Sequence, residues 1–208
     1  MTMPGDLPLS FSQERLWFLD ALRPGGTEYL LPLTLRVRGK LDVAALSRSL
    51  DAFVARHEVL RTRYRSREGV PVQVVGKPQP VPLPIEGVTE SELDTIVAAE
   101  LTVPFDLATD LPLRARLLRL DAREHVLLVV VHHIAFDGAS WDVFAAELAE
   151  LYRAFHAGTL PGLPALPVQY ADFALWQRED AATRLARPAS PLRTQTRGSA
   201  PGRRSRAR

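Results

Sequence analysis

The sequence predicts a mixed α/β fold in which a β-sheet is flanked by helices. Segments with alternating apolar residues, typical of strands, are interspersed with segments whose apolar residues recur every three or four positions, typical of helices. Residues 125–133 are mostly apolar at consecutive positions, as expected of a strand that is buried on both faces. The hydrophobic fraction of 46% in 208 residues is ample for a core.

The beginning of the chain predicts a helix, a strand and a second helix. Ser10 and Gln13 have the spacing of a capping box, so we expect a helix to begin there and to end at the following Pro-Gly-Gly turn. Apolar residues then alternate over residues 31–37, which is the period of a half-buried strand. Asp42 is a typical N-cap residue, and apolar residues recur after it at helical spacing as far as His57.

The middle of the chain predicts a hairpin and a third helix. Residues 60–65 and 70–75 have the composition of short strands, and the Glu68-Gly69 pair between them favours a tight turn. A Pro-rich connector follows. Thr89 and Glu92 then form a second capping box, which predicts a helix with an apolar stripe on its buried side.

The second half predicts two neighbouring strands and then two helices. Residues 113–120 and 125–133 are the strands, and the second of them is expected at the centre of the sheet. Helical spacing of apolar residues predicts a helix over 140–156 and a shorter one over 168–178. We expect the large aromatic residues, Trp176 among them, to pack in the core or between elements.

The charge is distributed unevenly and marks a boundary. Residues 1–180 hold all 24 acidic residues and 18 of the 26 basic ones, whereas residues 181–208 hold eight arginines and no acid. Residues 181–208 also have few large apolar side chains, so we expect an Arg-rich, disordered C-terminal tail after a folded unit at 7–180. The abrupt change of composition is typical of a frameshifted or artificially ended reading frame.

Composition excludes several classes of function. The chain has no cysteine, so disulfides, thiolate metal sites and a cysteine nucleophile are excluded. A net charge of +2 gives little support for nucleic-acid binding, and the arginines of the tail have no aromatic neighbours on which bases could stack. The longest apolar run, residues 126–131, is too short to span a membrane. We expect a cytoplasmic protein with no nucleic-acid or membrane partner.

The segment that follows the predicted central strand carries the candidate chemistry. His132 and His133 stand at the end of that strand, where functional groups commonly emerge into a cleft. Adjacent strand residues point to opposite faces, so one histidine is expected to be reactive and the other structural. Asp137 can fix the turn that follows, and Gly138 allows close approach of the backbone or a positive φ.

Other roles for these residues stay open on the residues alone. A histidine pair at a strand end is most often a hydrogen-bonded structural pair. Two histidines and an aspartate could also bind a metal, but the side chains diverge and the segment offers no third convincing ligand. A structural role therefore ranks above catalysis, and metal binding ranks lowest. The other three histidines, His57 among them, are assigned no role.

Four segments occur in an order that identifies a family. They read SxxQxRLWxL at residues 10–19, RHExLRT at 56–62, HHxxxDG at 132–138 and YxDFxxW at 170–176. In this order they resemble the motifs of the condensation domains of non-ribosomal peptide synthetases, relatives of chloramphenicol acetyltransferase. Ordered agreement of four motifs is far more specific than any one of them.

The resemblance implies a chloramphenicol acetyltransferase-like fold and amide-bond formation between two acyl groups. Each group would be a thioester on the 4′-phosphopantetheine arm of a separate carrier domain, with no cofactor bound covalently to this chain. His133 would face a tunnel and position or deprotonate the acceptor amine, while His132 and Asp137 would be structural. Arg61 is a candidate ion-pair partner of Asp137, and a residue of the missing half is an equal one. Gly138 would line the acceptor side through its backbone.

The resemblance covers only the N-terminal half of such a domain. A complete condensation domain continues into a second half of similar fold, and its active site lies where the halves meet. The expected partners are therefore carrier domains and the missing C-terminal half. Two alternatives stay open: a catalytically inactive fragment that only binds a carrier or partner, and a free-standing acyltransferase completed by oligomerisation.

Overall fold

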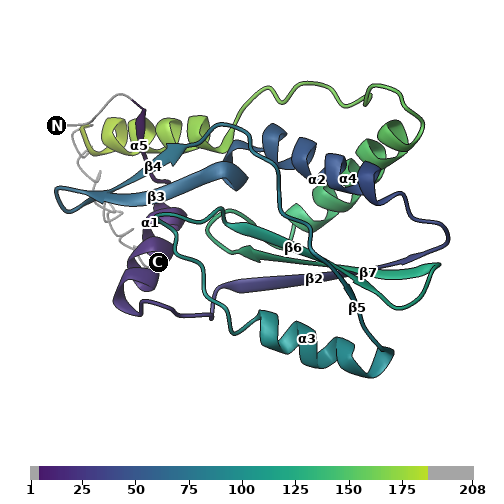
Figure 1. Cartoon of the computed structure of the whole chain (residues 1–208). Helices are drawn as coiled ribbons and strands as arrows, with labels where there is room; N and C mark the ends of the chain where they lie inside the picture. Colours follow the sequence, from purple (N-terminus) through teal and green to yellow (C-terminus); the bar gives the residue numbers. More distant parts are fainter. Residues whose placement is uncertain (1–4, 187–208) are drawn as a thin grey trace, which may run out of the picture.

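The computed structural model describes residues 5–186, and it confirms the mixed α/β class (Figure 1). A four-stranded sheet has the order β2 (Leu30–Arg38), β7 (Glu124–His132), β6 (Leu113–Arg119) and β5 (Ile85–Gly87). A three-stranded sheet has the order β1 (Asp6–Pro8), β4 (Val70–Val75) and β3 (Thr62–Arg67). Neighbouring strands are antiparallel except for the parallel pair β5 and β6.

Helices lie against both faces of the four-stranded sheet. The α-helices are α1 (Phe11–Leu22), α2 (Val43–Arg56), α3 (Leu93–Glu100), α4 (Ser140–His156) and α5 (Tyr170–Ala186). Two short 3₁₀ helices, η1 (Glu58–Arg61) and η2 (Glu90–Glu92), precede β3 and α3. Figure 1 shows α2 and α4 over one face of the sheet and α3 beneath the other.

Strand β7 is the centre of the fold, as predicted. It pairs with β2 on one side and β6 on the other, and its residues from His125 to His132 are all buried. Leu127, Val129 and Val131 belong to the core cluster that includes residues of α2 and α4. Leu128 and Val130 belong to a second cluster on the opposite face. Both faces of β7 are therefore covered, and the buried Nδ1 of His125, near the start of the strand, has no hydrogen-bond partner among the described residues.

The predicted N-terminal capping box is present and also ties α1 to the smaller sheet. The Gln13 amide nitrogen donates a hydrogen bond to the Ser10 hydroxyl (3.2 Å), and the Ser10 amide nitrogen donates to the Gln13 side-chain oxygen (3.0 Å). The Gln13 side-chain nitrogen donates to the hydroxyl of buried Tyr64 on β3 (3.1 Å). One polar side chain thus satisfies a helix end and crosses to the next element.

The predicted hairpin forms through a two-residue turn. Strands β3 and β4 pair directly, with Arg67 opposite Val70. The two residues between them, Glu68 and Gly69, both have positive φ, 52° and 83°. Positive φ at both central residues defines the type I′ turn, whose twist matches that of the flanking strands.

Three features differ from the sequence prediction. Strands β1 and β5 were not predicted, because three residues are too few to show an alternating pattern. Helix α5 continues to Ala186, so the predicted boundary at residue 181 is wrong for residues 181–186. Three alanines favour the extension, and Arg184 pairs with Asp180 one turn earlier at 2.8 Å. The rest of the predicted tail, 187–208, lies outside the described residues.

None of the helices within residues 5–186 combines the length and the apolar character needed to cross a bilayer.

Phe144 provides a test of the packing between α2 and α4. Its side chain is fully buried, 5.0 Å edge-on from Phe53 between ring centroids and 6.3 Å from Phe136. We expect Phe144→Ala to lower the free energy of unfolding by about 3–5 kcal/mol, because a cavity remains. Val143→Ala, at a position that is 47% exposed, is the matched control and should change it by about 0.5 kcal/mol. Urea denaturation measures both, and equal losses would contradict this packing.

Candidate functional site

The end of β7 separates the two adjacent histidines. His132 is the last residue of the strand and is 2% exposed, with the Phe105 and Tyr29 rings each 6.3 Å from its own ring. Its Nδ1 accepts a hydrogen bond from the amide nitrogen of Ile134 at 3.1 Å. His133 is exposed, and its backbone amide donates to the Tyr29 carbonyl at 2.8 Å. The predicted divergence of the pair is therefore present.

Burial gives His132 a single protonation state at neutral pH. Removal from water is the main cause that lowers the pKa of His132 to about 4, and the neighbouring His133 lowers it further. Since Nδ1 accepts the Ile134 hydrogen bond, the proton of the neutral ring is on Nε2. His132 thus holds the backbone turn after β7 without carrying a charge.

The ring of His133 is oriented by a backbone carbonyl. Its Nδ1 lies 2.7 Å from the carbonyl oxygen of Phe136. A carbonyl oxygen can only accept, so Nδ1 carries the proton and donates. The lone pair of the neutral ring is then on Nε2, which we infer from this partner. His133 can therefore accept a proton at one defined nitrogen.

Asp137 closes the loop that carries these groups. One carboxylate oxygen accepts hydrogen bonds from the Ser140 hydroxyl (2.6 Å) and the Ser140 amide nitrogen (2.9 Å). The Ser140 hydroxyl oxygen in turn accepts from the Asp137 amide at 3.2 Å. The bonds from Ser140 hold the pKa of the Asp137 carboxyl below its usual range. Asp137 thus fixes the turn into α4, the local role that the sequence suggested.

The structure does not form the predicted ion pair between Asp137 and Arg61. The Arg61 guanidinium pairs with Glu58 at 3.1 Å and donates to the carbonyl oxygens of Ala55 and Gly76. These partners join the end of α2 to the end of β4, and each guanidinium nitrogen donates to one of them. Arg61 therefore ties the end of α2 to the smaller sheet.

Neither the backbone conformation nor the surroundings of Gly138 in the described chain require a glycine at this position. It is exposed, it is not among the glycines with positive φ, and a Cβ placed on it would meet nothing within 4 Å. The resemblance to condensation domains predicts that the backbone of Gly138 lines the acceptor side of a tunnel. The described residues do not enclose that tunnel, so this contact stays a prediction.

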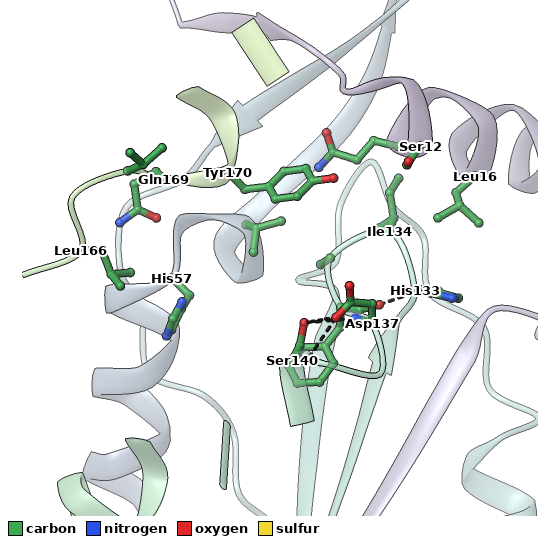
Figure 2. A pocket seen from close by; sticks show the side chains of 15 residues that line it. Ser12, Leu16, His57, His133, Ile134, Asp137, Ser140, Leu166, Gln169 and Tyr170 are labelled. Atoms are coloured by element: carbon green, nitrogen blue, oxygen red, sulfur yellow. Dashed lines mark hydrogen bonds between the residues drawn. The ribbon is translucent and has the colours of Figure 1, made fainter. Parts of the chain in front are cut away.

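A cleft of about 450 Å³ opens beside His133. Figure 2 shows His133 on one side, His57, Leu166 and Gln169 on the other, and Asp137 with Ser140 between them. The walls come from α1, the end of α2, the loop after β7 and the start of α5. Three motif segments that lie far apart in the sequence, at 10–19, 56–62 and 170–176, thereby meet the histidine segment.

His57, Gln169 and Tyr170 line this cleft although the sequence assigned them no role. The His57 Nε2 lies 2.7 Å from a carboxylate oxygen of Glu147, which also pairs with Arg56. The Gln169 side chain spans the end of α2, because it accepts from the Glu58 amide and donates to the Arg56 carbonyl. His57 and Tyr170 lie within the motifs at 56–62 and 170–176, and this was the only sequence feature that could have indicated a place in the site.

A metal site receives no support from this part of the chain. Among residues 5–186, no three histidine, aspartate or glutamate side chains gather closely enough to hold an ion.

The model of the family described as "Condensation domain" matches residues 3–188. The chain belongs to this family. Similar proteins include cyclosporin synthetase simA of Tolypocladium inflatum, 46% identical over 180 residues, and bassianolide nonribosomal cyclodepsipeptide synthetase of Beauveria bassiana, 42% identical over 184 residues. The matches cover 84% and 87% of this chain but only 1% and 6% of those proteins.

Solved structures confirm the fold expected of a condensation domain. The X-domain from teicoplanin biosynthesis is 39% identical with a TM-score of 0.82, and the match covers 91% of this chain and 42% of that one. The first condensation domain of the CDA synthetase is 26% identical with a TM-score of 0.76, covering 85% and 47%. The chain thus spans less than half the length of these solved relatives.

The buried state of His132 predicts a pH dependence of stability. Between pH 6.5 and 4 the unfolded chain takes up a proton on this histidine that the folded chain does not, so folding weakens as the pH falls. The contribution of His132 should make the free energy of unfolding about 2–3 kcal/mol lower at pH 4.5 than at pH 7.

Urea unfolding at both pH values tests this expectation. His132→Asn should remove this part of the pH dependence, whereas His156→Asn, at an exposed ring, should retain most of it. If the free energy of unfolding of His132→Asn changed with pH as much as that of the wild type, His132 would not be the source of the pH dependence.

Proposed function

We propose that this condensation-domain chain is the histidine-bearing part of an enzyme that forms amide bonds. The donor is an acyl group held as a thioester, and the acceptor is the amine of an aminoacyl group. Each is presented on the 4′-phosphopantetheine arm of a separate carrier domain, which enters as substrate. Similarity to condensation domains of peptide synthetases supports peptide-bond formation as the reaction class.

The separation of His132 from His133 carries the proposal. One imidazole is buried, neutral and bonded to backbone, whereas the other stands in the cleft with its ring fixed by Phe136. An imidazole whose ring orientation is fixed in a cleft is a group suited to general-base chemistry on an amine.

The proposed steps are as follows. Nε2 of His133 accepts a proton of the acceptor amine as the amine nitrogen attacks the thioester carbonyl carbon. The C–N bond forms, the C–S bond breaks, and the proton passes to the departing pantetheine thiolate. Nδ1–H of His133 keeps its bond to the Phe136 carbonyl throughout, and Asp137 keeps the loop that carries this carbonyl in place.

The proposal includes a second, C-terminal half of the domain. The cleft in this chain is open beside exposed His133, and the solved relatives are more than twice as long as the segment they share with it. A second half would exclude water from the thioester and align the two arms. The predicted cytoplasmic location stays a prediction.

One observation favours a second candidate, a binding module without turnover. The X-domain from teicoplanin biosynthesis, which resembles this chain in fold and sequence, has been solved in complex with OxyB. By analogy, the surface of this chain would hold a carrier domain or partner enzyme in place. A binding module of this kind would bind the carrier domain or partner enzyme but would form no amide product.

Substitution of His133 distinguishes the two candidates. The assay supplies two loaded carrier domains to the chain together with the part of the first condensation domain of the CDA synthetase that lies beyond the matched segment. His133→Ala should reduce amide product by about 10²–10⁴-fold, the usual contribution of a general base. Mass spectrometry of the carrier-bound product gives the readout.

His156→Ala is the matched control, because its ring is on the surface and pairs with Asp42 away from the cleft. It should leave product formation unchanged. If wild type and His133→Ala are equally inactive while carrier affinity persists, the enzyme proposal fails and the binding module stands.

A further inference from the structure

A second, smaller cavity lies in the wall of the cleft. It has a volume of about 110 Å³ and is formed by the end of α2, η1, the loop after β7 and the first turn of α4. We call it the side pocket, and its apolar lining residues are Phe53, Val59, Leu60, Ala135, Phe136 and Val143. It shares Val59, Ala135 and Phe136 with the cleft, so it is a recess of the cleft itself.

Packed aromatic rings hold the shape of the side pocket. The ring centroid of Phe136 lies 4.3 Å from that of Trp141 and 6.3 Å from that of Phe144. The Phe53 ring lies edge-on to Phe144 at 5.0 Å. Phe53 and Phe136 are both buried. Because these rings are fixed by one another, the side pocket is formed before any substrate binds.

Two polar side chains, His57 and Ser140, complete the lining. The Ser140 hydroxyl donates to Asp137 and accepts from its amide nitrogen. The Nε2 of His57 lies 2.7 Å from a carboxylate oxygen of Glu147, which can only accept, so a neutral His57 ring has its lone pair on Nδ1. Among the described residues, no side chain that lines the pocket then has a free donor. A carboxylate that entered would lose its water without gaining a partner.

Phe136 connects the side pocket with the reacting position. Its carbonyl accepts the hydrogen bond from Nδ1 of His133 at 2.7 Å, and the same residue lines the side pocket. In the proposed reaction the acceptor amine lies at Nε2 of His133. The side chain of an aminoacyl group is attached to the α-carbon that carries this amine, whereas the carbonyl carbon separates the donor side chain from it. The acceptor side chain is therefore the nearer of the two.

We propose that the side pocket receives the side chain of the acceptor aminoacyl group and selects small aliphatic side chains such as that of valine. This inference rests on the proposed function, which it extends by naming the class of acceptor. An apolar cavity of about 150 Å³ holds a benzene molecule. The side pocket, at about 110 Å³, therefore suits an aliphatic group of a few carbons better than an aromatic ring.

The first test measures selectivity in the amide-forming assay described above. The acceptor carrier is loaded in turn with valyl, glycyl, aspartyl or phenylalanyl groups, and kcat/KM is measured for each. We expect kcat/KM for the valyl group to exceed that for the glycyl group by about tenfold or more, because glycine leaves an apolar pocket empty. The aspartyl group, of similar size but charged, and the larger phenylalanyl group should also react more slowly than the valyl group.

Substitution of Val143 changes the size of the side pocket. Val143→Phe should fill it and bring the ratio of kcat/KM for valyl over glycyl close to one. Val143→Ala should widen it and raise kcat/KM for phenylalanyl relative to valyl. Val103→Phe is the matched control, because Val103 is 49% exposed, as Val143 is 47% exposed, and lies after α3 outside the side pocket. It should keep the wild-type ratio, and unchanged circular dichroism shows that the variants fold.

The second test locates the side chain on the full chain without turnover. The probes are valyl-, glycyl- and N-acetylvalyl-pantetheine analogues in which an amide replaces the thioester. They are added to the chain with isotope-labelled valine methyl groups, and the methyl signals are followed by NMR. We expect the signals of Val59 and Val143 to shift with the valyl analogue and to shift much less with the other two. The N-acetylvalyl analogue resembles a donor, because its amine is blocked.

The remaining outcomes overturn the proposal. Equal kcat/KM for all four acceptors, a valyl preference that persists in Val143→Phe, or methyl signals that do not respond to the valyl analogue would each reject the side pocket. Equal shifts with the glycyl analogue would assign it to the pantetheine arm, and equal shifts with the N-acetylvalyl analogue would assign it to the donor. Shifts with the valyl analogue but no amide product from any acceptor would leave the side pocket standing and reject the proposed function.

Discussion

The burial of β7 on both faces is the constraint on which the site depends. Neighbouring strands satisfy the backbone of β7, and core clusters cover the side chains above and below it. Because successive residues of a strand point in opposite directions, the last positions of β7 cannot present two equivalent side chains. His132 is buried beside the core and His133 is exposed, so a single step along the backbone separates a neutral structural ring from an accessible one.

Backbone groups then set the chemistry of both rings. Ile134 donates to His132, and Phe136 accepts from His133, so the short loop after β7 determines which nitrogen of each ring carries the proton. Asp137 and Ser140 close this loop through reciprocal hydrogen bonds at the start of α4. The site therefore depends on local backbone geometry, with no metal cluster among the described residues.

Helix α5 carries both a wall of the cleft and exposed aromatic rings. Tyr170 lines the cleft at the beginning of α5, and the exposed rings of Phe173 and Trp176 follow it along the same helix. Alanines beneath the helix bring it close to the smaller sheet and force the large rings outward.

The sequence by itself determined the features that depend on neighbours along the chain. The capping residues Ser10 and Asp42 and the Glu68-Gly69 turn formed as predicted, and the apolar strand predicted at 125–133 spans 124–132, because helix caps, turns and strand period are local properties. The divergence of His132 and His133 followed from the same strand period.

Only the tertiary structure decided the contacts between distant segments. Arg61 pairs with Glu58 and donates to the carbonyls of Ala55 and Gly76 instead of pairing with Asp137, and Trp176 faces solvent while Ala174 is buried. Glu58 stands only three residues before Arg61, but the contact of Arg61 with Gly76 and the buried face of α5 have no local signal, because they depend on which elements pack together. The walls of the cleft are set in the same way, since they join segments more than 100 residues apart.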